Sequence, residues 1–507
     1  MEKRRFGKTG WFPFSAILAL LYSFLFVAAE FYGNPVAGLR GFFVIALQWG
    51  AVTLCCWGVI GALSVSRVVF AVVFPILMLL SATLAYFETT MGVEFTPASL
   101  ELMLINDFGT WSTVMSPLLF IVMAAALLAG IGAAFFRWRH VMVAHPVDYL
   151  AISLVVAVTP FFFVKSLMAP VGTRMPYVFY CTVDQYLDNR ININENRTTF
   201  DNVEVSVADS VPLDVVFVIG ESLRADHLSL NGYSRPTTPL LEKDSNVISF
   251  PHMRTIPCFT HLSVPYILTL ADSVNSARAF DDQSFITLFK KAGFSTAWIS
   301  SQDETPAYAY FMHECDTIIM THASKSLYDF GKWLDSDILP EFTAHGFKGE
   351  RNLTVLHTIG SHWWYPSHYD EEDAVFKPET GSRILSELSR EEIVNSYDNT
   401  IVATDRFLSA VIRQLRDRNA ILIYISDHGE ALGEDGNYLH GADYPELHNP
   451  ACLVWYSDAY GQRYPERIEA LRRNSSRRWL SDSMFHTVLD AASLSTPVKV
   501  DSLSLFR

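Results

Sequence analysis

Five long apolar stretches within the first 168 residues constrain most strongly what this chain can fold into. They cover roughly residues 13–31, 40–63, 67–87, 115–136 and 147–168. Each is long enough to cross about 30 Å of hydrocarbon as a helix. The whole chain has 507 residues, of which 50% are hydrophobic, so membrane segments are expected. The sequence therefore predicts a transmembrane domain of five helices over residues 1–168.

Basic residues beside these stretches predict how the helices are oriented. They lie before the first stretch, at residues 3–8, between the second and third, at Arg67, and between the fourth and fifth, at residues 137–140. Basic residues favour the cytoplasmic side, so five crossings deliver the rest of the chain to the periplasm of a bacterial inner membrane. Arg40 is the exception. One buried or re-entrant helix among the five would invert this orientation.

Two connectors accompany the predicted spans. The loop between the third and fourth stretches has the spacing of an amphipathic helix on the outer face of the membrane, through Leu100, Met103, Leu104 and Phe108. The second connector, residues 169–212, is amphipathic over residues 177–189 and polar and turn-like over residues 192–197. We expect it to be an interfacial helix followed by a linker.

From residue 213 onward, apolar runs alternate with helical patterns. Continuous apolar runs, as in buried parallel strands, occur at residues 214–220, 294–300, 352–359 and 420–426. Helical periodicity occupies residues 284–292 and 391–417. This alternation predicts an α/β domain over residues 213–507, with a mostly parallel sheet between helices.

Ionisable residues follow the ends of three of these predicted strands. Glu221 follows the first, His362 closes a segment after another, and Asp427 and His428 follow a third, with His440 shortly beyond. The carboxyl ends of parallel strands meet at one edge of a sheet, and carboxylates with imidazoles are the usual ligands of zinc. Any one of them alone would be an ordinary helix cap or surface residue. Together they predict a zinc site.

A nucleophile for transfer chemistry is expected in the segment from residue 255 to residue 265. A hydroxyl at a helix N-terminus beside zinc loses its proton more readily and meets an anion in a favourable field. Thr255, Thr260 and Ser263 all satisfy this requirement. The residue types alone do not choose among the three.

Two long motifs resemble the phosphoethanolamine transferases that modify lipid A, a branch of the alkaline phosphatase/sulfatase superfamily. They are Gly-Glu-Ser-Leu-Arg-Ala-Asp-His-Leu-Ser-Leu-Asn-Gly-Tyr at residues 220–233 and Ser-Asp-His-Gly-Glu-Ala-Leu-Gly-Glu-Asp-Gly-Asn-Tyr-Leu-His-Gly at residues 426–441. The resemblance extends over nearly the whole chain. It implies an alkaline-phosphatase-like periplasmic domain after a five-helix transmembrane bundle.

The resemblance also implies roles for individual residues. Thr260 would be the nucleophile and would touch the zinc. One tightly held zinc ion would be bound by Glu221, Asp427 and His428. Catalysis, and binding of the substrate phosphate or of a second zinc, would fall to His362 and His440. The phosphoethanolamine headgroup would contact Asn106 and Thr110, in the loop between the third and fourth apolar stretches.

The function implied is zinc-dependent transfer of phosphoethanolamine from phosphatidylethanolamine to a lipid A phosphate or another envelope glycan, through a phosphothreonine. We expect a membrane-embedded monomer. A net charge of −15 excludes nucleic acid as a partner, because phosphate binding needs a basic face. The alternatives are a glycerophosphate or other phosphodiester transferase, a phosphodiesterase, or a non-catalytic membrane sensor.

The chain departs from the pattern of that family at several positions. Val114 replaces a frequent glutamate, Ile256 and Tyr266 stand where many relatives have a disulfide, and His261 follows the nucleophile in place of a small residue. A basic residue expected at 302–306 is absent. The cysteines outside the apolar stretches could form disulfides or remain thiols: Cys181, Cys258, Cys315 and Cys452.

Overall fold

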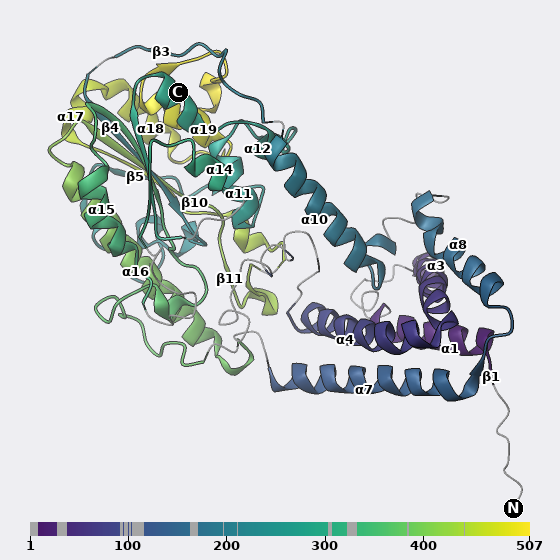
Figure 1. Ribbon diagram of the computed structural model, residues 1–507. Helices are drawn as coiled ribbons and strands as arrows, with labels where there is room; N and C mark the ends of the chain where they lie inside the picture. The colour runs from purple at the N-terminus through teal and green to yellow at the C-terminus, as the bar shows by residue number, and fades with distance from the viewer. Residues whose placement is uncertain are drawn as a thin grey trace, which may run out of the picture. The chain divides into compact units, whose positions relative to one another are not determined.

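The computed structural model describes residues 9–27, 38–91, 95, 100, 103, 116–162, 171–195, 197–209, 211–302, 307–321, 332–382, 385–440 and 442–507 (Figure 1). These residues form two compact units. One comprises the described residues up to Asn189, and the other those from Arg190 onward. No disulfide joins any of the six cysteines, all of which lie in the described ranges and are buried.

The first unit is built of apolar helices. These are α1 (Trp11–Phe26), α3 (Gly38–Val65), α4 (Arg67–Met91), α7 (Pro117–His140) and α8 (Pro146–Phe162). Among the described residues, three segments are long and apolar enough to cross a membrane, namely Ala46–Val65, Arg67–Thr90 and Pro117–His140. The helices α1 and α8 have 16 and 17 residues, so the count of five spans stays a prediction.

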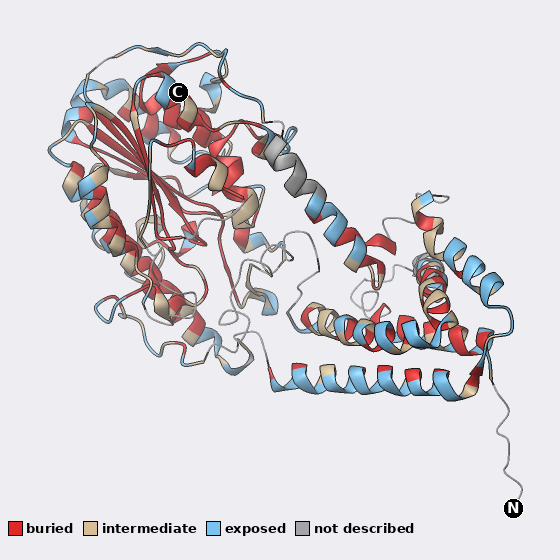
Figure 2. Ribbon diagram, viewed as in Figure 1, coloured by how far each residue is buried: buried red, intermediate tan, exposed pale blue. Residues whose placement is uncertain are grey.

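Within this unit, α4 packs along α7 and α3 packs along α8. The helices α4 and α7 approach closely at Gly130, where a Cβ would lie 2.7 Å from the Cα of Pro75. Some polar side chains pair between helices: Tyr22 pairs with Ser81 at 2.6 Å. Most of the surface of α7 is exposed and apolar (Figure 2), as on a helix that faces lipid.

The connector after the apolar helices contains α10 (Tyr177–Glu195). The predicted helix over residues 177–189 is therefore present. The interpretation of residues 192–197 as turn-like is wrong for the first four of them, because the helix continues to Glu195. Residues 177–195 contain no proline or glycine, so no helix-breaking residue ends the helix at residue 189. Its location at a membrane surface remains a prediction.

The second unit contains a sheet of seven strands in the order β5-β13-β10-β4-β9-β7-β8. The central strands β10 (Ala420–Ser426), β4 (Leu213–Gly220), β9 (Arg351–His357) and β7 (Ser295–Ser300) are parallel to one another, as predicted. At one side β8 (Thr317–Met320) continues in parallel. At the other side β13 (Cys452–Tyr456) is antiparallel to both of its neighbours, β10 and β5 (Val247–Ser249).

Successive side chains of a strand point to opposite sides of the sheet, and here both sides are apolar. Helices therefore cover both faces. In β4, Val215 and Phe217 pack in one core with α11 (Thr260–Leu268), α13 (Phe285–Lys291) and α19 (Ser483–Ala491). Val216 and Val218 pack in the other core with α15 (Ile338–His345) and α16 (Arg390–Leu415).

The longest helix of this unit, α16, begins with a capping box. Ser389 accepts a hydrogen bond from the amide of Glu392, whose side chain bonds back to the amide of Ser389. Four shorter helices complete the unit: α12 (Arg278–Asp281), α14 (Ala309–Met312), α17 (Asp458–Arg463) and α18 (Pro465–Asn474).

Short strand pairs accompany the main elements of the two units. They are β1 (Thr9–Gly10) with β2 (Val141–Met142), β3 (Ser206–Val207) with β15 (Leu494–Ser495), β6 (Met253–Arg254) with β14 (Trp479–Leu480), and β11 (Ala431–Leu432) with β12 (Tyr438–Leu439). The pair β11 and β12 bears on the candidate site, because His440 directly follows β12.

Candidate active site

Glu221 and Asp427 lie side by side because the strands that carry them are paired in register. Gly220 of β4 is opposite Ser426 of β10, so the next residue of each strand emerges at the same edge of the sheet. Both carboxylates are buried. Oδ1 of Asp427 accepts hydrogen bonds from the amides of Ser222 at 3.0 Å and His428 at 2.7 Å. Oε1 of Glu221 accepts one from the Ser222 hydroxyl at 2.8 Å.

His428 is fixed in one orientation by its neighbour. Its Nδ1 lies 2.7 Å from the carbonyl oxygen of Gly429, and because a carbonyl only accepts, Nδ1 carries the hydrogen. Nε2 of the neutral ring then presents its lone pair to the site. It lies 3.6 Å from Oε1 of Glu221 and 3.3 Å from Oδ2 of Asp427. This is the arrangement of a metal-binding imidazole whose second nitrogen is held by the backbone.

Thr260 is the first residue of α11 and faces the same three side chains. Its Oγ1 lies 3.3 and 3.1 Å from the two carboxylate oxygens of Glu221 and 3.3 Å from Nε2 of His428. The first amides of a helix have no intrahelical acceptor, so those of Thr260 and His261 favour an anion at this point. A hydroxyl, two carboxylates and an imidazole therefore converge at the N-terminus of a helix.

The donor set fits a zinc ion. One ligand atom each from Glu221, Asp427 and His428 can be chosen so that all lie within 4.8 Å of one another, and all three residues are buried. Oδ2 of Asp427 is buried and makes no hydrogen bond within the described part of the chain. Carboxylate oxygens and imidazole nitrogens are both zinc ligands in proteins, and a bound cation would stabilise a buried carboxylate oxygen that has no donor.

The electrostatics of the two carboxyl groups point the same way. Burial would raise the pKa of Glu221, but the imidazoles of His428, His362 and His440 outweigh it and lower the pKa to about 2. Burial and the neighbouring Glu221 carboxylate raise the pKa of Asp427 well above its usual range. The two buried carboxylate groups disfavour each other's charge. A bound cation would stabilise the charged form of both.

A second group of side chains adjoins the first. Nδ1 of His440 lies 2.7 Å from Oε2 of the buried Glu430. Burial disfavours the His440 imidazolium, but Glu430 outweighs this effect and raises the pKa of His440 to about 9. The His440 ring lies 4.8 Å from that of His428 and 6.0 Å from that of His362, measured between centroids. The three histidines therefore form one wall of the site.

Comparison with known proteins places this arrangement in a family. The Sulfatase family profile matches residues 214–494, which is more than half of the chain. The chain belongs to the sulfatase family. The alignment with the Kdo(2)-lipid A phosphoethanolamine 7''-transferase of Salmonella typhimurium is 32% identical over 293 residues, covering 55% of this chain and 50% of that protein. The chain thus spans about half the length of the curated relatives it matches.

Solved structures show that this sulfatase-family protein has a known fold along its length. The integral membrane lipooligosaccharide phosphoethanolamine transferase A (EptA) from Neisseria meningitidis matches with a TM-score of 0.79 at 23% identity, covering 98% of both chains. The C-terminal periplasmic domain of EcEptC from Escherichia coli, solved in complex with Zn, matches with a TM-score of 0.55 at 23% identity, over 60% of this chain and 89% of that one. The predicted alkaline-phosphatase-like fold of the second unit and the predicted N-terminal apolar helices are thus confirmed.

Some residues of the predicted motifs lie apart from this site. Nδ1 of His227 bonds to Asp398 at 2.8 Å, and Arg224 pairs with Asp226 at 2.7 Å and with Glu434 at 2.9 Å. His357 is buried under Trp298, and burial lowers its pKa to about 4 despite the charge of Glu221. The pairs made by His227 and Arg224 support the fold. The predicted headgroup residues Asn106 and Thr110 lie outside the described residues.

Sequence reasoning did not single out three side chains that complete the site. Nε2 of Gln302 lies 3.2 Å from Oε2 of Glu221, and it also donates to the carbonyl of Thr358 at 2.8 Å. Ser222 donates to Glu221, and Glu430 holds His440. The signal for Gln302 was its place just beyond the end of β7, at the same edge of the sheet. A neutral amide thus stands at the start of the segment where a basic residue was expected.

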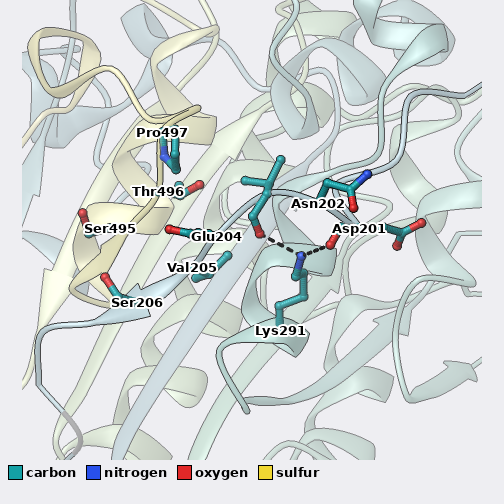
Figure 3. A pocket seen from close by; sticks show the side chains of 10 residues that line it. Asp201, Asn202, Glu204, Val205, Ser206, Lys291, Ser495, Thr496 and Pro497 are labelled. Carbon is teal, nitrogen blue, oxygen red and sulfur yellow. Dashed lines mark hydrogen bonds between the residues drawn. The ribbon is translucent and has the colours of Figure 1, made fainter.

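A surface cavity of about 720 Å³ lies elsewhere in this sulfatase-family protein (Figure 3). It is lined by residues 201–206, by residues 495–497 and by Lys291. The Lys291 ammonium group donates to the carbonyl oxygens of Phe200, Asp201 and Val203, at 2.6, 2.8 and 2.8 Å. Its three donors are thereby satisfied, so this cavity does not offer the cation that an anionic substrate would require.

Proposed function

We propose that this protein transfers phosphoethanolamine from phosphatidylethanolamine to a lipid A phosphate or another envelope glycan, through a phosphothreonine at Thr260. The observation that carries this proposal is the position of Thr260 Oγ1, 3.1–3.3 Å from the Glu221 carboxylate oxygens and His428. Names of relatives support it, because the aligned proteins are called phosphoethanolamine transferases.

Glu221, Asp427 and His428 would hold one zinc ion, with a second ion as an alternative at His362 and His440. A zinc ion bound there would supply Lewis-acid stabilisation of the charge that develops on the transferring phosphoryl oxygens. The chain itself fixes the donor atoms. Gly429 sets the tautomer of His428, and the amides of Ser222 and His428 hold one oxygen of Asp427.

In the first half-reaction, Oγ1 of Thr260 attacks the phosphorus of phosphatidylethanolamine. The bond from Oγ1 to phosphorus forms as the bond from phosphorus to the diacylglycerol oxygen breaks. The hydroxyl proton of Thr260 passes to a neighbouring base, and diacylglycerol leaves with a proton. The N-terminal amides of α11 face the same point, so they favour the anionic oxygens around the phosphorus.

In the second half-reaction, an oxygen of the acceptor attacks the phosphothreonine, and Thr260 leaves with its proton restored. His440 and His362 would bind the substrate phosphate and carry protons. Because Nδ1 of His440 is engaged by Glu430, its Nε2 is the atom available for transfer. The same side chains thereby serve both halves of the reaction.

The proposal also assigns the parts of the chain. Residues 1–168 would form the transmembrane domain, residues 169–212 an interfacial helix and linker, and residues 213–507 the periplasmic catalytic domain of an inner-membrane monomer. Both donor and acceptor are lipids, so a tethered domain meets them without extraction. Asn106 and Thr110 would contact the ethanolamine headgroup.

Mass spectrometry of extracted lipid A tests this function. Wild type, Thr260→Ala and Ser263→Ala would each be expressed in a bacterium whose lipid A is unmodified. We expect lipid A with one added phosphoethanolamine group from wild type and from Ser263→Ala, and none from Thr260→Ala. Equal modification by Thr260→Ala would refute the role of Thr260. Diacylglycerol release without any modified glycan would indicate a phosphodiesterase instead.

A further inference from the structure

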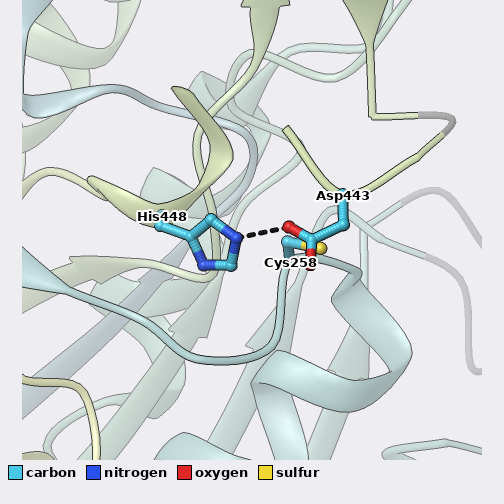
Figure 4. A group of neighbouring side chains, drawn as sticks. All are labelled: Cys258, Asp443 and His448. Atoms are coloured by element: carbon cyan, nitrogen blue, oxygen red, sulfur yellow. Dashed lines mark hydrogen bonds and ion pairs between the residues drawn. The ribbon is translucent and has the colours of Figure 1, made fainter. Parts of the chain in front are cut away.

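Cys258, Asp443 and His448 form a second cluster of metal-binding side chains, separate from the Glu221 cluster (Figure 4). One ligand atom of each, the Cys258 sulfur, a carboxylate oxygen and an imidazole nitrogen, lies within 4.8 Å of the other two. The cysteine comes from the segment before α11. The other two residues come from the segment that follows His440. Figure 4 shows the contact between the His448 imidazole and the Asp443 carboxylate.

The hydrogen bonds of His448 leave one ring nitrogen facing an acceptor. Nδ1 lies 2.9 Å from the carbonyl oxygen of Thr255, so it carries a hydrogen. In the neutral ring Nε2 then has only a lone pair, yet it lies 2.5 Å from Oδ1 of Asp443. Two acceptor atoms this close require a proton or a metal ion between them. A backbone carbonyl that fixes the tautomer in this way is the usual support of a metal-binding histidine.

Cys258 supplies a soft ligand in an apolar setting. The residue is 4% exposed and packs with Ala431 and Leu447, with Phe259 and Tyr444 against them. His448 is not placed to act as its base, since both imidazole nitrogens face oxygen atoms. Cys258 and His448 therefore do not form a nucleophile–base pair of the protease type. Thiolate, imidazole and carboxylate together favour zinc and other late first-row divalent ions over magnesium or calcium.

We propose that Cys258, Asp443 and His448 form a second divalent-metal site that takes Zn²⁺ or a similar late first-row ion. Binding exchanges the thiol proton of Cys258 for a bond from sulfur to the metal, and the proton is released to solvent. The Asp443 side chain is 72% exposed, so the ion has an entry path and a position remains for water. This proposal does not depend on the transferase function.

An ion at this site would join the two segments that carry functional residues. Cys258 lies two residues before Thr260, and Asp443 lies three residues after His440. The segments already meet through the backbone, because the amide of Thr255 donates to the carbonyl of His448 at 3.2 Å. A metal bridge would hold Thr260 and the His440 segment at a fixed separation. The bound ion is thus a positioning element for Thr260.

Cobalt substitution tests the site through a signal that only a sulfur ligand can give. The full-length protein in detergent would be stripped of metal with a chelator and titrated with Co²⁺. We expect a near-ultraviolet thiolate-to-cobalt charge-transfer band in wild type, and none in Cys258→Ser. The Glu221 cluster contains no sulfur, so its own cobalt bands in the visible range would persist in that variant.

Two further variants make the result decisive. Cys315→Ser removes another buried cysteine and should leave the band unchanged. Asp443→Asn alters a largely exposed side chain, so the variant should fold as wild type does, and it should weaken cobalt binding at this site by about tenfold or more. Absence of the charge-transfer band from wild type, or an undiminished band in Cys258→Ser, would overturn the proposal. In that case His448 is an imidazolium that donates at both ends.

Discussion

Glu430 holds His440 in place: Nδ1 of the imidazole lies 2.7 Å from Oε2 of the carboxylate. The other carboxylate oxygen accepts a hydrogen bond from the Tyr365 hydroxyl at 2.9 Å. Both Glu430 and Tyr365 are fully buried. The orientation of the His440 ring, which lies 4.8 Å from the ring of His428, is therefore fixed from the core of the domain.

Replacing Glu430 by glutamine should slow transfer by about 10- to 100-fold, the range typical of a lost partner behind a functional histidine. The glutamine side chain fills the same volume but no longer carries the charge that stabilises the His440 imidazolium. Turnover of a fluorescent phosphatidylethanolamine measures the effect. Glu391→Gln, at an exposed position at the start of α16, is the matched control and should retain full activity.

Asp427→Asn should remove the tightly bound metal. The variant keeps the size of the side chain but loses the charge of the buried Oδ2 atom, which lacks a hydrogen-bond donor within the described part of the chain. We expect metal affinity to fall by about 100-fold or more. Elemental analysis of the dialysed protein measures this. Asp405→Asn, a buried carboxyl group on α16, should keep its metal, and equal metal contents in the two variants would contradict the assignment.

Gly360 approaches the backbone of Glu221 so closely that no side chain fits. It has φ +50°, and a Cβ would lie 2.8 Å from the carbonyl oxygen and 3.0 Å from the amide nitrogen of Glu221. Gly360→Ala should cost about 1–3 kcal/mol of stability and displace Glu221, so metal affinity should fall as well. Gly381→Ala is the control, because nothing lies within 4 Å of the position of its Cβ. Equal melting temperatures for the two variants would count against this packing.

Asp405 predicts a pH dependence of stability. Burial outweighs the hydrogen bonds from the amides of Leu240 and Leu241 and raises its pKa from 3.8 to about 6. Between these values the folded protein binds more protons than the unfolded chain. The stabilisation, on the order of 2–3 kcal/mol, is therefore complete below the unfolded pKa and is lost as the pH rises through about 6.

Melting temperatures at a series of pH values test this dependence. As the pH rises from about 4 to about 7, wild type should lose stability relative to Asp405→Asn, which carries no titrating group at this position. The exposed Asp417→Asn, just beyond the same helix, should follow wild type. A constant difference between wild type and Asp405→Asn across this range would show that the carboxyl group does not titrate there.

The sheet could be predicted from sequence because its strands are buried on both faces. Apolar runs such as the one from Val215 to Ile219 identify β4, and the residues just beyond the strands lie at the edge of the sheet that forms the candidate site. That rule alone brought Glu221 and Asp427 together. The ends of helices were harder to predict, as α10 shows. A polar sequence without glycine or proline does not indicate where the last turn of the helix lies.

Residue types do not choose among the three candidate nucleophiles, but the contacts of their hydroxyl groups differ. The Thr255 hydroxyl donates to the carbonyl of Pro257 at 3.1 Å, and the Ser263 hydroxyl donates to the same carbonyl at 2.9 Å. Both are occupied in shaping the loop, whereas Thr260 faces the carboxylates. The Cys258 cluster was equally hidden, since Cys258 lies about 190 residues before the other two members and meets them only through the fold.

Peptide mass spectrometry of the purified protein is the most direct test of the central claim, that Thr260 carries the transferred group. The protein would be incubated with phosphatidylethanolamine without an acceptor, quenched and digested. We predict the mass of one phosphoethanolamine group on the peptide that contains Thr260, fragmenting at that residue, and none in Thr260→Ala. Diacylglycerol release with no modified Thr260 peptide, or with the group on Thr255 or Ser263, would contradict the account.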